Sequence, residues 1–220
     1  MPRTARASVG GVCYHVLNRG NSGSRVFRSQ VDYKSFVQLL RDAEQRVSLR
    51  MLAYCLLPTH FHLVLWPYRE GELSTWMQWL LTAHVRRHHQ RYQSHGHIWQ
   101  GRFKAFPVQQ DDHLLTVLRY VEQNLLRKTL VDQSEDWVWS SLRGRNGNSS
   151  FVRSGPVAVP KKWERVVNRS FSPGELDGLR QSVNRGTPFG SPTWVTRTVK
   201  RLGLESSLRS RGRPRKYQKS

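Results

Sequence analysis

Residues 57–65 read Leu-Pro-Thr-His-Phe-His-Leu-Val-Leu, and this stretch decides the fold. β-forming apolar residues follow Pro58-Thr59 directly, which is typical of a strand that begins after a tight turn. Residues two apart on a strand face the same way, so His60 and His62 would share one face while their apolar neighbours enter the core. The preceding segment is also apolar, so the sequence predicts a hairpin over residues 50–66.

The segments around this hairpin alternate between strand and helix patterns. The expected elements are a strand at 11–18, a helix from 29 to about 47, strands at 50–57 and 60–66, a helix at 73–92, a strand at 98–108 and a helix at 111–128. The first six follow the order of a ferredoxin-like βαββαβ core, which makes the fold class α+β with an antiparallel sheet. The last helix is an addition to that core.

The chain changes character after about residue 130, so we expect three parts. Residues 1–130 form the predicted catalytic domain, 131–205 a C-terminal extension with short helices, and 206–220 a basic tail. Ser172-Pro173 and Ser191-Pro192 are helix starts, because serine caps a helix and proline suits its first position. The tail is rich in lysine and arginine, and we expect it to be disordered without a partner.

The charge of the chain narrows the class of protein. Thirty-six Lys and Arg stand against 15 Asp and Glu, which gives a formal net charge of +21 and excludes an ordinary neutral metabolic enzyme as the default. Such an excess favours a polyanionic partner. No apolar run approaches the ~20 residues that span a bilayer, so we expect nucleic acid and no membrane. Two cysteines and no signal peptide indicate a reducing, cytoplasmic setting.

His60 and His62 are candidate metal ligands. Two imidazoles on one strand face can bind one divalent ion, and the absence of a cysteine cluster favours an open, catalytic site over structural zinc. The alternative is a pair of surface histidines on a basic sheet, because His-x-His alone is unspecific. His84, His88 and other histidines near an arginine-rich helix are interpreted as solvated or phosphate-facing.

The helix at 111–128 supplies a possible nucleophile. Tyr120 and Asn124 lie one turn apart, so the Asn124 amide oxygen could be a third metal ligand while the Tyr120 hydroxyl lies beside the ion. A cation that polarises a phosphodiester would allow tyrosine to attack it, leaving a phosphotyrosine and a free 3′-OH. Rejoining would then need no nucleotide cofactor. The alternative for Tyr120 is a tyrosine at the edge of the core.

These motifs, taken in order, resemble the REP-associated tyrosine transposases, a branch of the single-tyrosine HUH endonucleases. The matching stretches are Tyr14-His15-Val16, Asn18-Arg19-Gly20, Leu57–His62, Trp99–Lys104, Arg119–Asn124, Trp139-Ser140-Ser141, Gly186–Gly190 and Gly212–Lys216. The resemblance implies nicking and rejoining of single-stranded DNA at hairpins of repetitive extragenic palindromes (REP), with Mg²⁺ or Mn²⁺. It implies His60, His62 and Asn124 as ligands and Tyr120 as nucleophile. Many relatives have proline after the asparagine. Here Leu125 follows, so the helix could continue through Arg127.

Basic and polar side chains near these motifs are the expected DNA contacts. They are Arg19, Arg25, Arg86, Arg87, Gln100, Arg102, Lys104, Arg119, Arg127, Arg211, Arg213, Arg215 and Lys216. Three tryptophans could stack on unpaired bases, namely Trp99, Trp137 and Trp139. The basic tail could also fold back over the site.

Two other functions fit parts of the pattern. A non-catalytic hairpin-binding regulator or nucleoid protein would keep the fold and the charge without nicking DNA. An RNA-binding protein of RRM-like topology fits less well, because histidines stand where base-stacking aromatic residues would be expected. We expect a monomer or homodimer in the cytoplasm, associated with the nucleoid.

Overall fold

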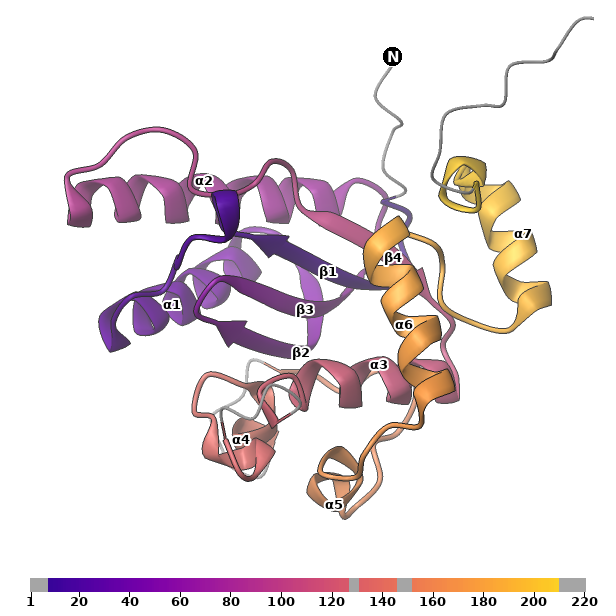
Figure 1. The fold of residues 1–220 in the computed structure, drawn as a ribbon. Coiled ribbons are helices and arrows are strands. Elements are labelled where there is room, and N and C mark those ends of the chain that lie inside the picture. Colours follow the sequence, from indigo (N-terminus) through magenta and orange to yellow (C-terminus); the bar gives the residue numbers. More distant parts are fainter. Residues whose placement is uncertain (1–7, 127–130, 146–151, 210–220) are drawn as a thin grey trace, which may run out of the picture.

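One antiparallel sheet forms the centre of the molecule. A computed structural model describes residues 8–126, 131–145 and 152–209 of the chain. The strands are β1 (Cys13–Arg19), β2 (Leu49–Leu57), β3 (His60–Pro67) and β4 (Lys104–Val108), in the spatial order β2-β3-β1-β4. All neighbouring strands run antiparallel. This topology (Figure 1) confirms the predicted α+β class and its ferredoxin-like core.

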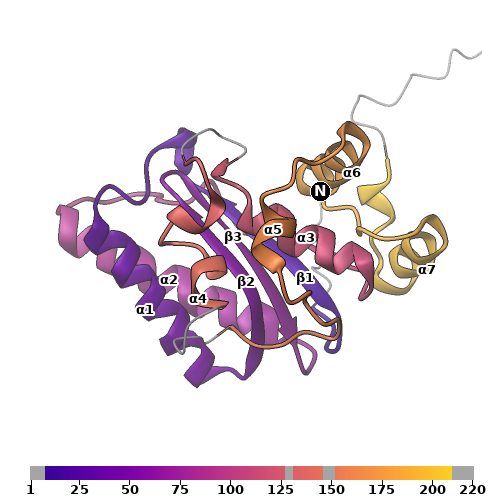
Figure 2. The same cartoon turned by 90° about the horizontal axis from the view of Figure 1, so that it is seen from below.

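Helices cover both faces of the sheet. α1 (Gln30–Arg46) and α2 (Glu72–Tyr92) lie on one face, and α3 (Asp112–Glu122) lies on the other (Figures 1 and 2). Apolar side chains of α1 and α2 are buried between these helices and the sheet. α3 buries Leu114, Val117, Leu118 and Val121 on the opposite face. No helix in the described ranges is long and apolar enough to cross a membrane.

The face under α1 and α2 is packed with aromatic rings. Trp99 lies 5.1 Å from Phe61 between ring centroids and is buried, so it serves the core and does not offer a free surface for bases. Trp139 stacks on Tyr33, and the Trp137 indole donates to the Leu56 carbonyl. These contacts favour core packing over base stacking for all three predicted tryptophans.

His84 and His88 correct the interpretation of the histidines on α2. Both side chains are buried, His84 against Phe36 and Trp99, and neither is solvated. Burial lowers the pKa of His84 to about 3, with a further contribution from neighbouring His88. His84 is therefore a neutral core residue.

Two predicted elements are shorter than expected. β4 begins at Lys104, because residues 98–103 form a loop fixed by backbone bonds from Asn21 to the Ile98 carbonyl and from Gln100 to the Arg19 carbonyl. α3 ends at Glu122 and does not reach residue 127. The Gln123 side chain there donates to the Arg169 carbonyl, 2.7 Å away, which ties the helix end to the extension.

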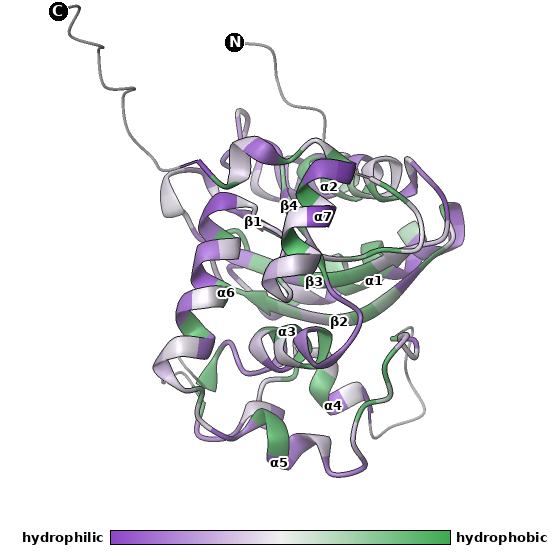
Figure 3. Cartoon of the chain, turned by 90° about the vertical axis from the view of Figure 1, so that its right-hand side faces the viewer, coloured by the Kyte–Doolittle hydropathy of each residue, from purple (hydrophilic) through white to green (hydrophobic). Residues whose placement is uncertain are grey.

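The extension after residue 130 packs on the α3 side of the molecule. Its helices are α4 (Ser141–Arg145), α5 (Trp163–Val167), α6 (Pro173–Arg185) and α7 (Pro192–Leu202). Ser172 and Ser191 cap α6 and α7 with proline at the start of each helix, as predicted. Leu142, Trp163 and Leu179 join the core beneath α3. Figure 3 shows the hydrophilic stretches of α6 and α7 on the outside. Of the tail predicted at 206–220, residues 206–209 are described and begin within a short 3₁₀ helix at Glu205–Ser207, and the rest lies outside the described residues.

The extension also contacts both edges of the sheet. On the β2 edge, Leu56 donates its N–H to the Trp139 carbonyl and Met51 accepts from the Arg153 N–H, at 2.9 and 2.7 Å. On the β4 side, the Phe189 N–H donates to the Pro107 carbonyl at 2.9 Å. The outer strands are therefore hydrogen-bonded to the extension along part of their length.

Candidate functional site

The two histidines of β3 occupy the sheet face that α3 covers. His60 and His62 have ring centroids 5.2 Å apart, while Phe61 between them enters the core on the other face, as predicted. The Nδ1 atom of His60 lies 2.8 Å from the Thr59 hydroxyl. The Nδ1 atom of His62 lies 2.8 Å from the Nε2 atom of His15. A metal ion on this pair would therefore use the Nε2 atoms.

His15 belongs to the Tyr14-His15-Val16 stretch, and the sequence alone indicates no role for it. It lies on β1 and is fully buried. The register pairs Leu17 with His62 across the two strands, which brings the diagonal neighbour His15 next to the His62 ring. Alternation along residues 11–18 predicts which face of the strand carries His15. The contact with His62 depends on the pairing of β1 with β3, which the sequence does not show.

Tyr120 lies on α3 over the histidine pair. Its ring centroid is 6.0 Å from His62 and 5.9 Å from His15, and the side chain is only 7% exposed. Asn124 lies two residues beyond the end of the helix, so the predicted helix at 111–128 ends before this residue. Tyr120 and Asn124 nevertheless line the same pocket as His60 and His62.

Glu122 fixes the segment between these two side chains. It is a buried carboxylate that accepts hydrogen bonds from Arg145 Nε at 2.7 Å, Trp163 Nε1 at 2.6 Å and the Ser141 hydroxyl. These donors come from α4 and α5. The end of α3, which carries Tyr120 and Asn124, is therefore held by the extension. Sequence analysis gave Glu122 no role of its own.

A cavity of about 680 Å³ joins these side chains. Its lining is mostly basic and polar and contains no acidic side chain among the described residues. Besides the histidines, Tyr120 and Asn124, it includes Asn18, Arg19, Gln100, Arg102 and Lys104, and from α6 Arg180, Val183 and Asn184. Four predicted DNA contacts therefore meet at the site. The α6 residues were not predicted, because their approach to the pocket depends on long-range packing.

The other predicted DNA contacts lie elsewhere. Arg119 points into the extension, where it donates to the Arg169 and Ser170 carbonyls, both at 2.7 Å, and lies over the Phe171 ring. Burial lowers the pKa of Arg119, and its side chain does not line the pocket. Arg25 is exposed but does not line the pocket.

Arg86 and Arg87 are on α2, across the sheet from the pocket, so they do not belong to this site. Arg87 forms an ion pair with Asp42 of α1 at 3.5 Å. The remaining predicted contacts lie outside the described residues. These are Arg127, Arg211, Arg213, Arg215 and Lys216.

The donor set in the pocket fits a hard or borderline divalent ion. Two imidazoles and one amide oxygen could hold such an ion and leave positions open for substrate. The described residues contain no group of three or more His, Cys, Asp or Glu side chains that could hold a metal. Any ion here would therefore depend on the Asn124 amide or on oxygens of a bound substrate.

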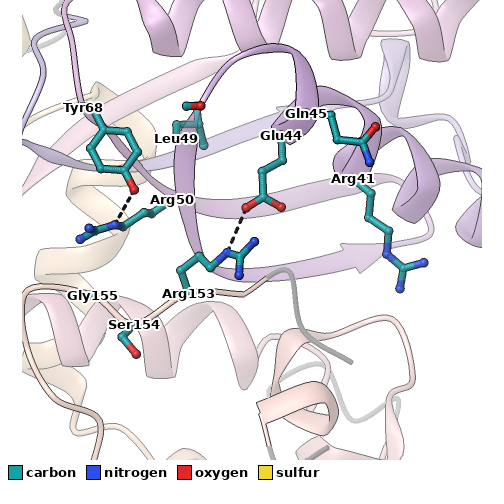
Figure 4. A pocket seen from close by; sticks show the side chains of 10 residues that line it. Arg41, Glu44, Gln45, Leu49, Arg50, Tyr68, Arg153, Ser154 and Gly155 are labelled. Atoms are coloured by element: carbon teal, nitrogen blue, oxygen red, sulfur yellow. Dashed lines mark hydrogen bonds and ion pairs between the residues drawn. The ribbon is translucent and has the colours of Figure 1, made fainter. Parts of the chain in front are cut away.

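A larger hollow of about 1000 Å³ lies between α1, the start of β2 and residues 153–155 (Figure 4). Its polar contacts are internal, from Arg153 to Glu44 at 3.1 Å and from Arg50 to the Tyr68 hydroxyl at 2.7 Å. No histidine lines this hollow, so its tyrosine, Tyr68, has no histidine beside it there. We therefore assign the chemistry to the smaller pocket.

A solved structure resembles this fold. A structure of a REP-associated tyrosine transposase bound to a REP hairpin matches with a TM-score of 0.52 and 19% identity, covering 70% of this chain and 92% of that one. A Deinococcus radiodurans R1 crystal structure assigned to the transposases matches with a TM-score of 0.40 and 19% identity, over 55% and 96% of the two chains. No curated protein matches.

The structural likeness at this identity supports the fold. The family follows from the sequence, since the family model described as "Transposase IS200 like" matches residues 8–124, more than half of the chain. The matched residues end at Asn124. They include His60, His62 and Tyr120 and do not include α6. The chain belongs to the IS200-like transposases, a family of DNA-cleaving enzymes.

Proposed function

We propose that this protein is a divalent-metal-dependent endonuclease and strand transferase for single-stranded DNA, with Tyr120 as nucleophile. The observation that supports this most is the shared pocket. It brings Tyr120, two imidazoles and an amide together with Arg19, Arg102 and Lys104. A tyrosine, a ligand set and phosphate-binding cations are the parts that phosphodiester transfer requires.

The proposed reaction keeps the number of phosphoester bonds constant. The Tyr120 hydroxyl oxygen bonds to the phosphorus, the bond from phosphorus to the 3′ oxygen breaks, and the phenolic proton ends on the released 3′-OH. A Mg²⁺ or Mn²⁺ ion held by His60, His62 and Asn124 would polarise the phosphodiester. Rejoining reverses these steps with a 3′-OH as the attacking group, so no nucleotide cofactor is consumed.

We propose hairpins of REP DNA as the substrate. The structural relative was solved with a REP hairpin, and the pocket here is lined by Arg19, Arg102, Lys104 and Arg180 without an acidic side chain among its described residues. Unpaired DNA beside a hairpin can place one phosphate against Tyr120 while its neighbours contact Arg19, Arg102 and Lys104. Arg180 and Asn184 extend the polar wall beyond the residues that the family model covers.

The test is a covalent adduct on a denaturing gel. A single-stranded REP hairpin with a label 3′ of the nick is incubated with Mn²⁺, because the 5′-phosphotyrosine retains that side of the strand. We expect an adduct with the wild-type protein and none with Tyr120→Phe, while hairpin binding stays the same. Tyr68→Phe, at an exposed tyrosine outside the pocket, is the matched control.

Three outcomes would contradict the proposal or part of it. An adduct that persists in Tyr120→Phe would assign the nucleophile elsewhere. Tight hairpin binding by the wild-type protein with neither nicking nor adduct would support the alternative, a non-catalytic hairpin-binding protein. Full cleavage in EDTA would remove the metal from the mechanism and leave the tyrosine chemistry to be explained by the cationic side chains alone.

A further inference from the structure

His15 is buried directly behind the proposed metal ligand His62. The Nε2 atom of His15 and the Nδ1 atom of His62 are 2.8 Å apart, and their ring centroids are 5.0 Å apart. His15 is wholly inaccessible to solvent and also packs edge-on against Phe106 at 4.8 Å and Tyr120 at 5.9 Å. It does not line the pocket, so it cannot contact the substrate.

A hydrogen bond between two imidazoles requires one donor nitrogen and one acceptor nitrogen. If His62 carries its proton on Nδ1, it donates to His15 and presents a lone pair on Nε2. If His15 donates instead, the His62 proton sits on Nε2 and blocks that atom as a ligand. Only the first arrangement lets His62 bind a metal from the pocket side.

We propose that His15 is a positioning residue that holds His62 in the metal-binding tautomer and orientation. This proposal rests on the proposed function, because it assigns His62 to a metal. His15 Nε2 accepts the Nδ1 proton of His62, and the strand pairing of β1 with β3 fixes the distance between the rings. A partner that orients a metal-bound histidine in this way typically changes metal affinity by about 10- to 100-fold.

The same contact explains why a histidine occupies this apolar position. Its neighbours on this face of the sheet include Cys13, Val64 and Phe106, which are all fully buried. A buried imidazole among such residues is costly unless its nitrogens have partners. The His62 ring supplies the partner of His15 Nε2.

The direct test reads the tautomer of His62 by NMR on the full-length protein with ¹⁵N-labelled histidine and no metal. We expect the proton on Nδ1 in the wild-type protein. A proton mainly on Nε2 would overturn the proposal. This measurement does not depend on whether the protein cleaves DNA, so its outcome is separate from the outcome of the adduct test.

The second test measures Mn²⁺ affinity by electron paramagnetic resonance with the hairpin bound. We expect His15→Phe to weaken Mn²⁺ binding about 10- to 100-fold. We expect His15→Gln, whose amide oxygen can still accept, to recover most of that loss. His97→Phe is the control at an exposed histidine. Hairpin affinity in EDTA should match the wild type in all variants, and unchanged Mn²⁺ affinity in a folded His15→Phe would refute the role of His15.

Discussion

Replacing Glu122 with glutamine should destabilise the protein far more than an ordinary surface substitution. The carboxylate is buried and accepts from Arg145, Trp163 and Ser141. Glutamine keeps the volume and one oxygen but removes the charge and turns an amide N–H₂ toward one of the three donors. A lost charge-assisted bond costs about 1.5–3 kcal/mol, and an unsatisfied buried donor about 1–3 kcal/mol.

We therefore expect the free energy of unfolding to fall by about 3–5 kcal/mol, the range for a broken buried ion pair. In a chain of this size each kcal/mol lowers the Tm by about 2–4 °C. The matched control is Glu44→Gln, which removes the half-exposed pair with Arg153 and should cost at most about 1 kcal/mol. Urea unfolding followed by tryptophan fluorescence measures both variants.

A double-mutant cycle with Arg145→Met separates the ion pair from the other contacts of Glu122. The double variant should lose less stability than the sum of the single variants, because the two side chains touch. If Glu122→Gln costs no more than Glu44→Gln, the reasoning from burial and hydrogen bonding is wrong. If the costs of Glu122→Gln and Arg145→Met add fully, Arg145 is not the partner that matters.

Three further predictions concern the core, a tight turn and DNA binding. The pKa of His84, about 3 when folded, lies below its unfolded value of 6.5, so the unfolded state binds the extra proton and stability falls as the pH drops. Between pH 6 and 4, urea titrations should show wild-type stability falling about 1.4 kcal/mol per pH unit more steeply than that of His84→Leu. Gly20→Ala should lower the Tm because the new Cβ would lie 2.3 Å from a backbone oxygen, whereas Gly174→Ala, with open space around it, should not. Arg102→Gln and Lys104→Gln should each reduce the salt-dependence slope of hairpin binding by about 0.7–0.9, measured by fluorescence anisotropy.

The regular elements could be predicted because their signals are local. Alternation along residues 60–66 predicted which histidines share a face, and apolar spacing predicted α1 and α2. The same apolar spacing also predicts the burial of two histidines that were interpreted as solvated. His84 and His88 continue the stripe of Leu73, Met77 and Leu80 on α2, so their burial follows from periodicity.

The partners in the site could not be predicted, because each depends on long-range packing. His15 meets His62 only through the register of β1 and β3, and Arg180 reaches the pocket only because α6 packs beside β4. Arg119 shows that a positive charge near the site in the sequence does not predict where the side chain points. Its position beside Tyr120 indicated a phosphate contact, yet two carbonyls and Phe171 occupy its guanidinium. Asn124, predicted as a metal ligand, lines the pocket, although the helix expected to carry it ends earlier.

The bonds from the extension to the outer strands have a consequence for how the protein behaves in a crowded solution. Unpaired strand edges offer a template onto which another chain can add, and this is a common route to aggregation. Here Trp139 and Arg153 bond to β2, while Phe189 bonds beside β4. Removing residues after 130 would expose these backbone groups, so a shortened protein should precipitate more readily than the full chain even where its remaining fold is intact.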